Sequence, residues 1–353
     1  MRNAGDEAVL DAILAELRGI DPEMEITVLS RSPEETQARH GVRAIHSFGL
    51  RGMLRAMRAS ALYVNGGGSL IQDVTSSRSL WYYLYTLAAA KRRGCRVMMY
   101  GCGVGPVGRP FNRKIAGRII DRCVDAVTLR SGHDLDALRA LGVTKPEVTL
   151  ATDPALSLPG APDGEIDALL RACGVDPEKR YLCICVRRWP GVGEKLPLFA
   201  AAAALARESH GLTPLILAVN RQEDVAAARE LRELIAGESL LITEDMSTGQ
   251  VVGLISRMEA VLSMRLHPLI FSASHSVPAA GVSYDPKVSA FLDDIGQTNY
   301  IAFDTLTAPE QLTALIDAAA CTSREDLRRS AARLLSLERR NAETAEKLLC
   351  QQA

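Results

Sequence analysis

Hydrophobic residues in this chain form short continuous runs that alternate with segments of helical spacing. Runs such as "EITVLS" (25–30), "ALYVN" (61–65) and "CRVMMYG" (95–101) each precede a stretch in which apolar residues recur every three or four positions. Continuous apolar runs are typical of strands buried on both faces of a parallel sheet, and the helical spacing indicates amphipathic helices. The alternation predicts an α/β fold with a doubly wound parallel sheet.

The alternation is interrupted once and then restarts. The segment "SLPGAPDGEIDALLRACGVDPEKR" (157–180) is rich in Pro, Gly and Asp and is typical of a linker. The sequence therefore predicts two Rossmann-like domains, residues 1–156 and 181–353, the second ending in one long amphipathic helix over 324–349. Ligands of such folds bind at the carboxyl ends of strands, so we expect the site in a cleft that the two domains face.

The first helical pattern, over residues 6–17, has no strand before it. A doubly wound domain normally opens with a strand, so we expect that the natural start of the first domain was lost or misassigned. No signal peptide precedes this helix, which favours a cytoplasmic protein.

Composition narrows the classes of partner. The net charge is −1 over 353 residues, which argues against a nucleic-acid-binding protein and requires a local basic site for any anionic ligand. Apolar runs such as "LWYYLYTLAAA" are about half the length of a membrane span, so they predict core helices. The eight cysteines form no CxxC pair and are expected to be buried free thiols, with Cys183 and Cys185 on one face of a strand. The histidines lack metal-ligand spacing, so no metal site is predicted.

A glycine-rich stretch, "NGGGSLIQDVTSSRSL" (65–80), is the first candidate for binding chemistry. Three consecutive glycines after a strand let the backbone approach a ligand closely, and the spacing is neither GxGxxG nor the Walker pattern. The stretch predicts a contact surface for a hydroxyl-rich ligand, although a tight loop with a serine cap would also explain it. Asp73 could take a proton from a sugar hydroxyl. The candidate binding residues here are Gly66, Gly67, Gly68, Ser69, Gln72 and Arg78.

Two further strand ends in the first half add candidates. A second glycine loop, "YGCGVGPVGRP" (100–110), includes Gly103, and "VTLRSGHD" presents Arg130. Arg130 is either an exposed arginine at a helix start or a clamp for an anion.

The second half carries cations near predicted strand ends. Arg265 and His267 alternate on a predicted strand in "SMRLHPLIFS", so they are expected to point the same way, and Lys287 adds a third cation. These residues favour an anion-binding and acid/base site over a buried structural network. Arg188 and Trp189 end another strand and suggest a cation beside a ring that stacks on a sugar.

These segments together resemble the polysaccharide pyruvyl transferase family, and within it the CsaB-type branch that modifies a secondary cell-wall polymer. The resemblance spans nearly the whole chain but departs at the start, where only Asn3-x-Gly5-Asp6-Glu7 remains of a longer strand-and-loop motif. The matching segments are "NAGDEAVLDAIL", "NGGGSLIQDVTSSRSLWYYL", "GCGVGPV", "LRS", "TDPAL", "VRRW" and "SMRLHPLIFSASHSVPAAGVSYDPKVSAFL".

The resemblance implies a fold like that of GT-B glycosyltransferases and transfer of pyruvate from phosphoenolpyruvate, a co-substrate, to a sugar. The implied acceptor is a β-linked N-acetylmannosamine on a lipid-linked precursor at the inner membrane face, the product is a 4,6-ketal, and the implied role is in S-layer anchoring. The donor-site cations of the family correspond to Arg130, His267 and Lys287, with Arg265 nearby. The resemblance implies no metal or redox cofactor. It does imply peripheral contact with the membrane.

Two other functions remain open from the residues. A GT-B glycosyltransferase using a nucleotide sugar would want a carboxylate near the strand ends of the second domain, where the nearby acids are Glu244, Asp245 and Asp285. A two-domain binding protein without catalysis would predict a secreted chain. The sequence leaves the oligomeric state open.

Overall fold

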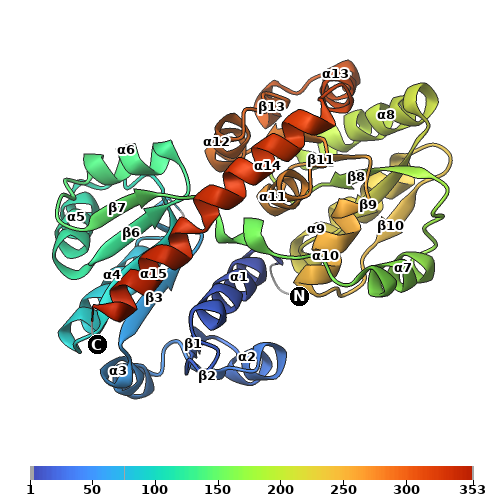
Figure 1. Cartoon of the computed structure of the whole chain (residues 1–353). Helices are drawn as coiled ribbons and strands as arrows, with labels where there is room; N and C mark the ends of the chain where they lie inside the picture. Colours follow the sequence, from blue (N-terminus) through green and yellow to red (C-terminus); the bar gives the residue numbers. More distant parts are fainter. Residues whose placement is uncertain (1–3, 75, 352–353) are drawn as a thin grey trace. The chain divides into compact units, whose positions relative to one another are not determined.

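The computed structural model describes residues 4–74 and 76–351, and these form an α/β protein with two compact units (Figure 1). The N-terminal unit comprises residues 9–154 and the described end of the chain from 336 on. The C-terminal unit comprises residues 155–335 together with the described residues before Val9. Each unit has a parallel sheet and a hydrophobic core, which confirms the predicted fold class.

The N-terminal unit alternates strands and helices in the way that the hydrophobic pattern predicts. Its elements are α1 (Ala4–Ile20), β1 (Thr27–Ser30), α2 (Pro33–His40), β2 (Arg43–His46), α3 (Leu50–Ala59), β3 (Leu62–Gly66), β4 (Ser69–Ile71), α4 (Ser77–Arg92), β5 (Arg96–Val104), α5 (Pro110–Cys123), β6 (Ala126–Leu129), α6 (Gly132–Ala140), β7 (Glu147–Leu150) and, from the far end of the chain, α15 (Arg340–Cys350).

The C-terminal unit repeats the alternation after a short 3-10 helix, Pro154–Ser157. Its elements are α7 (Asp163–Ala172), β8 (Arg180–Cys185), α8 (Val192–His210), β9 (Leu212–Leu217), α9 (Arg221–Leu234), β10 (Leu240–Ile242), α10 (Thr248–Ser256), β11 (Ala260–Ser263), α11 (Leu266–Ser274), β12 (Ala279–Ser283), α12 (Pro286–Asp294), β13 (Tyr300–Ala302), the 3-10 helix Phe303–Thr305, α13 (Pro309–Ala320) and α14 (Arg324–Glu338).

The sheet of the C-terminal unit has six parallel strands in the order β10-β9-β8-β11-β12-β13. The first strand of the unit, β8, therefore lies in the middle, and the chain winds outward in both directions from it. Helices α8, α9 and α13 pack together on one face, while α7, α10, α11 and α12 pack on the other. Because both faces are covered, β8, β9 and β11 are buried almost throughout.

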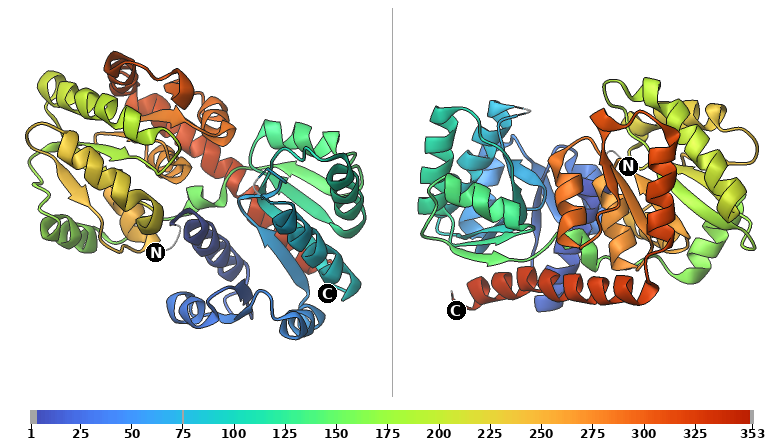
Figure 2. Two further views of the ribbon diagram at one scale, coloured as in Figure 1. Left: turned by 180° about the vertical axis from the view of Figure 1, so that it is seen from behind. Right: turned by 90° about the horizontal axis from the view of Figure 1, so that it is seen from above.

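The main sheet of the N-terminal unit runs β3-β5-β6-β7, with β4 beside β5, and all of its strands are parallel. These strands follow one another in chain order, and right-handed crossovers place their connecting helices on a single face. The opposite face of β5 and β6 is covered by α15 (Figures 1 and 2). Strands β1 and β2 pair only with each other among the described residues.

The C-terminal segment and the predicted linker differ from the sequence expectation. One helix was expected over 324–349, but the helix is divided at Arg339, so α14 belongs to the C-terminal unit and α15 to the N-terminal unit. The predicted linker 157–180 contains α7, which packs on α10 through Ile166 and Gly253. The chain passes from one compact unit to the other between Pro154 and Ala155, and each unit also includes one end of the chain from beyond that boundary.

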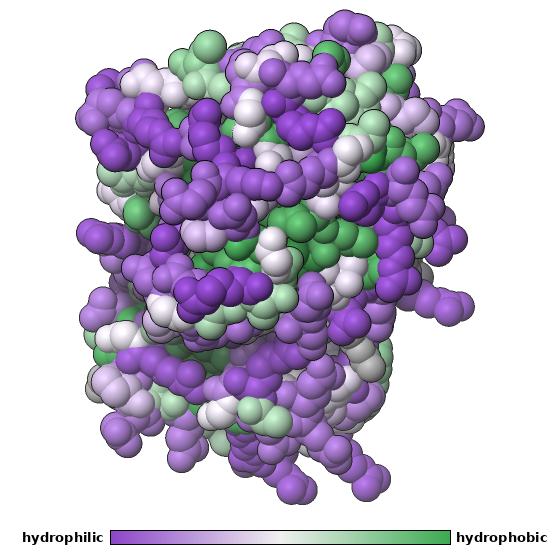
Figure 3. All heavy atoms as spheres, turned by 90° about the vertical axis from the view of Figure 1, so that its right-hand side faces the viewer, coloured by the Kyte–Doolittle hydropathy of each residue, from purple (hydrophilic) through white to green (hydrophobic). Residues whose placement is uncertain are grey.

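The surface and the thiols fit a globular protein. Figure 3 shows one face, on which hydrophilic side chains predominate around smaller hydrophobic patches. Cys183 and Cys185 are buried with their sulfur atoms 3.8 Å apart, which confirms that they share one face of β8. Within the described residues, we find no helix that is both long and apolar enough to cross a bilayer.

The junction between α14 and α15 buries a carboxyl group in the N-terminal unit. Glu338 is 1% exposed, and the nearby charged groups are Glu16 of α1, Asp153 and Arg339. Asn341 donates through Nδ2 to the backbone oxygen of Thr152 and, at 3.5 Å, to Oε1 of Glu338. Burial, reinforced by the charge of Glu16, raises the pKa of Glu338 to about 8.

This raised pKa predicts a stability that falls as pH rises. Between about pH 4.5 and 8 the folded protein keeps a proton on Glu338 that the unfolded chain has released. The free energy of unfolding therefore falls over this range, and the whole loss of stability is present above pH 8. Glu338→Gln removes this ionisation and is expected to stabilise the protein at pH 9 by about 2–4 kcal/mol, with little change at pH 5. Urea unfolding of both proteins at the two pH values measures the difference; a gain of equal size at both would contradict ionisation of Glu338 as the cause.

Candidate functional site

The sheet of the C-terminal unit defines where a ligand can bind. Its strand order reverses direction between β8 and β11, and in open α/β sheets the crevice outside the carboxyl ends at such a reversal is the usual ligand site. The loops that leave β8 and β11 begin at Val186 and Met264. Four candidate side chains follow within four residues of a strand end: Arg187 and Trp189 after β8, and Arg265 and His267 after β11.

The structure corrects the predicted backbone of Arg265 and His267. Strand β11 ends at Ser263, Arg265 is the N-cap residue of α11, and His267 lies in the first turn of that helix. The two residues therefore do not alternate on a strand. The reason is Pro268, which is favoured in a first helical turn and cannot continue a buried strand.

His267 packs directly against the first turn of α1. A Cβ atom added to Gly5 would lie 2.2 Å from Nδ1 of His267, so only glycine leaves room for the imidazole. Gly5 belongs to the same compact unit as His267. Gly5, part of the Gly5-Asp6-Glu7 segment of the sequence resemblance, therefore has a defined position beside the imidazole. Asn3 of the same motif lies outside the described residues.

Arg265 is engaged by two carboxylates from the start of α9. Its guanidinium donates to Asp224, whose side chain is fully buried, and to Glu223 at 2.8 Å. Burial raises the pKa of Asp224 although Arg265 opposes the shift. The pair ties the first turn of α9 to the N-cap of α11, across the end of β8. Arg265 therefore takes part in a structural network of ion pairs, which was the alternative to an anion-binding role in the sequence analysis.

The loop after β8 supplies an arginine and an aromatic pair. Arg187 lies over the ring of Tyr284 at 4.4 Å and that of Trp189 at 5.2 Å, and its Nη1 donates to the Tyr284 hydroxyl. The Trp189 and Tyr284 rings are 4.7 Å apart. Sequence reasoning selected Arg188, which is exposed, and missed Arg187 and Tyr284. Their spacing of 97 residues left no local signal, because β8 and β12 meet at this edge only through β11.

Lys287 lies in the first turn of α12, after β12. Asp285 caps this helix by accepting from the backbone N–H of Lys287, and its other oxygen lies 3.3 Å from Nζ. Arg187 and Arg265 thus pair with Glu223 and Asp224, and Lys287 pairs with Asp285. The first-turn N–H groups of α11 and α12 add partial positive charge at the same edge. Together they can hold an anion that has several oxygen atoms.

In the N-terminal unit, the glycine-rich stretch is more ordered than a loop. Gly67 has a φ of +63°, and a Cβ there would lie 2.0 Å from the side chain of Val9, so α1 packs on it closely. The next residues, from Ser69, form β4 beside β5. Gly103 lies within β5, so the predicted second glycine loop is partly a buried strand.

Arg130, directly after β6, has a side chain that is 12% exposed and is paired, so the interpretation of an exposed arginine is wrong. Its guanidinium donates to Ser69 at 2.7 Å and to Asp153 at 3.3 Å, and Asp134 lies 4.0 Å away. A Cβ at Gly103 would lie 2.6 Å from this guanidinium, so glycine makes room for it. Ser69, Gly103 and Arg130 therefore lie together at the strand ends of the N-terminal unit.

Asp73 closes the loop between β4 and α4. It accepts from the backbone N–H of Gly108 at 2.7 Å, from that of Arg109 at 3.1 Å and from Nδ2 of Asn112 at 2.8 Å. The Asn112 hydrogen bond is the main reason that the pKa of Asp73 is lowered. Gln72 and Asp73 are half-buried, and Arg78 is exposed in the first turn of α4, which Ser76 caps. Thr75 lies outside the described residues.

The strand order and the paired α/β units define a class of protein, the two-domain α/β fold of GT-B glycosyltransferases and UDP-GlcNAc 2-epimerases. The UDP-GlcNAc 2-epimerase of Methanocaldococcus jannaschii matches with a TM-score of 0.64 and 11% identity over 90% of each chain. A glycosyltransferase from Rickettsia africae matches with a TM-score of 0.61 and 12% identity over 99% of this chain and 96% of its own. Anabaena Alr3699/HepE, solved with UDP-glucose, matches at 0.60 and 10% over 96% of each. These identities establish the fold alone.

A family profile assigns the chain more narrowly. The profile described as polysaccharide pyruvyl transferase matches residues 3–286, so the chain belongs to the polysaccharide pyruvyl transferase family. It is an enzyme that transfers a pyruvyl group onto a polysaccharide, and the family implies phosphoenolpyruvate as the donor. No curated protein matches the sequence.

The contact between Gly5 and His267 predicts a site-specific effect of a small substitution. Gly5→Ala adds a methyl group where the imidazole lies, so the ring or the helix must move, and we expect at least a tenfold loss of pyruvyl transfer. Gly164→Ala is the matched control, because a Cβ there meets nothing within 4 Å on helix α7 of the same unit. Phosphate release and melting temperature are measured for both; full activity of Gly5→Ala would exclude a working role for this contact.

Proposed function

We propose that the enzyme moves the pyruvyl group of phosphoenolpyruvate onto the 4- and 6-hydroxyls of a sugar and releases phosphate. The single observation that supports this most is the set of donors at one sheet edge of the C-terminal unit. His267, Lys287 and Arg187 come from the loops after three adjacent strands, beside two helix N-termini. Phosphoenolpyruvate carries a carboxylate and a phosphate, which need several such donors.

The reaction divides into steps that suit these residues. A proton is added to the methylene carbon of phosphoenolpyruvate, which becomes the methyl group and leaves an oxocarbenium-like centre at C2. One sugar oxygen adds to C2, the bond from C2 to the phosphate oxygen breaks, and the second sugar oxygen takes its place. Of the two hydroxyl protons, one balances the proton that went to carbon and the other leaves with phosphate. No change of oxidation state is needed.

We assign the proton donor to His267. An imidazole can both give and take a proton near neutral pH, and the Gly5 contact limits the positions that the ring can adopt. Lys287 and the first turns of α11 and α12 would hold the anionic groups and stabilise phosphate as it leaves. Arg265 would act by positioning the loop that carries His267, since its guanidinium is bound to Asp224 and Glu223.

The aromatic pair beside Arg187 gives this edge a surface for the flat face of the donor or for a sugar ring. Trp189 and Tyr284 are half-buried, with Arg187 over both rings. We propose that the glycine-rich segment of the other unit, Gly66 to Ser69 with Gln72 and Arg78, contributes to acceptor binding. Asp73 accepts three hydrogen bonds, and its carboxylate could accept a further one from a sugar hydroxyl and so orient it. Arg130 stays a predicted donor ligand on the same unit as that segment.

The finer substrate assignment follows the sequence resemblance. We propose a β-N-acetylmannosamine acceptor on a lipid-linked precursor of a secondary cell-wall polymer, met at the inner face of the membrane, in the service of S-layer anchoring. A nucleotide-sugar donor is disfavoured because three carboxylates that follow strands of this sheet already have cationic partners: Glu223 and Asp224 are bound to Arg265, and Asp285 lies beside Lys287.

Ligand-induced stabilisation separates the two donors. A ligand that binds only the folded protein adds about 2.7 kcal/mol at one hundred times its Kd, which raises the melting temperature by several degrees. We expect a rise with phosphoenolpyruvate and none with UDP. A rise with UDP alone would move the assignment to a nucleotide-sugar transferase.

Substitution of His267 tests the catalytic assignment. His267→Gln removes the proton donor and is expected to lower turnover about a hundredfold or more, while phosphoenolpyruvate still raises the melting temperature. His210→Gln is the matched control, because His210 lies at the end of α8 and pairs with Asp317. Phosphate release from phosphoenolpyruvate is followed with and without a synthetic N-acetylmannosaminyl lipid-linked disaccharide. Wild-type turnover by a folded His267→Gln protein would remove His267 from this role.

A further inference from the structure

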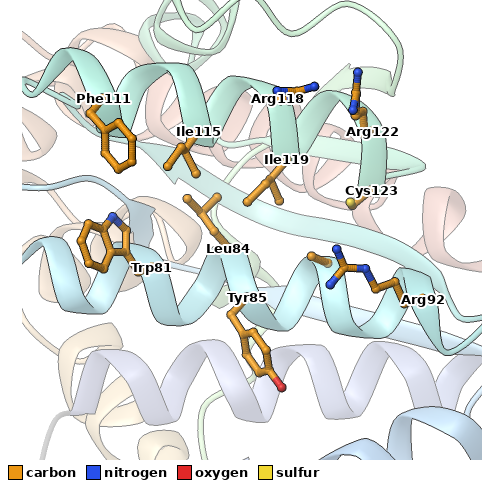
Figure 4. Close-up of a pocket in the computed structure, with 11 residues that line it drawn as sticks. Trp81, Leu84, Tyr85, Arg92, Phe111, Ile115, Arg118, Ile119, Arg122 and Cys123 are labelled. Atoms are coloured by element: carbon orange, nitrogen blue, oxygen red, sulfur yellow. The ribbon is translucent and has the colours of Figure 1, made fainter.

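A groove between α4 and α5 in the N-terminal unit is not used by the proposed reaction. It has a volume of about 610 Å³ (Figure 4). Trp81 and Phe111 face each other at one end, Leu84, Ile115 and Ile119 lie between the helices, and Arg92 and Arg122 lie at the other end. The groove is therefore apolar along its length and basic at one end.

Its aromatic side chains are exposed to an unusual degree. Phe111 is 65% exposed, Trp81 49% and Tyr85 42%, and all three count among the exposed large hydrophobic residues of the described chain. All three come from one pair of adjacent helices. Singly exposed hydrophobic residues need no explanation, but three aromatic rings around one groove mark a contact surface.

The charge of the same helices is also unlike the rest of the chain. Residues 77–123 contain ten Lys or Arg and one Asp, in a protein of net charge −1. In the described part of the chain, Arg92, Arg118 and Arg122 make no ion pair, whereas Lys91 and Arg96 both lie within ion-pair distance of Asp125. The arginines that line the groove therefore carry charge that no neighbouring carboxylate balances.

We propose that the α4–α5 groove binds the surface of an anionic lipid bilayer. Two helices that display aromatic rings beside unpaired arginines match an interfacial membrane contact, in which the rings enter the boundary of the headgroup layer and the cations meet lipid phosphates. A second copy of the chain is a poor occupant, because a symmetric contact would place one strongly basic surface on another.

The groove is linked to the segment proposed for acceptor binding. Trp81 donates through Nε1 to Oδ1 of Asn112 at 3.0 Å, and Asn112 donates to Asp73 at 2.8 Å. A bilayer on the groove would thus lie beside the loop that carries Gln72 and Asp73. A lipid-linked acceptor in that bilayer would then lie close to the proposed acceptor segment. The membrane contact does not depend on the reaction and can be tested without it.

Vesicle sedimentation of the whole chain, without donor or acceptor, tests the contact separately from the reaction. We expect sedimentation with vesicles of phosphatidylglycerol and phosphatidylcholine and not with pure phosphatidylcholine, weakening as salt is added. Arg118→Glu with Arg122→Glu is expected to lower the partition coefficient by about thirtyfold or more, and Phe111→Ser by about tenfold. The controls, Arg229→Glu and Leu234→Ser, change an exposed arginine and an exposed leucine on α9 and should bind like the wild type.

The two tryptophans allow a second readout. In a Trp189→Phe background, Trp81 is the remaining tryptophan, and its emission is expected to shift to the blue on addition of anionic vesicles. Absence of sedimentation, equal binding to neutral vesicles, or unchanged binding by the charge-reversed protein would overturn the proposal. A change of oligomeric state in the groove variants without loss of vesicle binding would assign the groove to a second copy instead. Melting temperatures of the variants show that they remain folded.

Discussion

The buried ion pair between Arg265 and Asp224 is the interaction on which the candidate donor site depends. It joins the first turn of α9 to the N-cap of α11 and so spans the end of β8, where the strand order reverses. Asp224 has no exposed side-chain surface, and a carboxylate left unpaired there would cost several kcal/mol. The pair therefore fixes the start of α11, and with it the position of His267 relative to Gly5, at the point where the sheet offers a ligand crevice.

A second constraint comes from the one-sided crossovers of the N-terminal unit. Since α4, α5 and α6 connect consecutive strands, they leave the other face of β5 and β6 to be covered by α15, which is contributed by the last residues of the chain. The helix break before α15 buries Glu338, whose pKa near 8 records the cost of placing a carboxyl beside Glu16 in a dry environment. The α4–α5 groove lies on the outer side of the same layer of connecting helices. The position of α15 and the exposure of the groove therefore both follow from the one-sided crossovers.

Much of this could be predicted from the sequence, where each signal was local. Continuous apolar runs predict the buried strands, glycines mark the end of β3, and Lys287 is predicted beside a strand end from its own neighbours. The errors arose where local pattern was ambiguous. The alternation of Arg265 and His267 in "SMRLHPL" suggested a strand, but Pro268 favours a first helical turn and α11 begins at Leu266. Arg188 was chosen over Arg187 because neither has a local feature that shows which one turns toward Tyr284.

The sequence by itself determined the two α/β halves, the positions of most strands and helices, and a set of segments specific enough to indicate the family. Hydrophobic periodicity and turn residues act over a few positions, so one chain suffices to read them. The tertiary structure alone decided the contacts between distant segments: Gly5 with His267, Arg265 with Asp224, Arg187 with Tyr284, and α15 on β5 and β6. Such pairs are created when sheet order brings strand ends together, and sheet order is a property of the whole packed core.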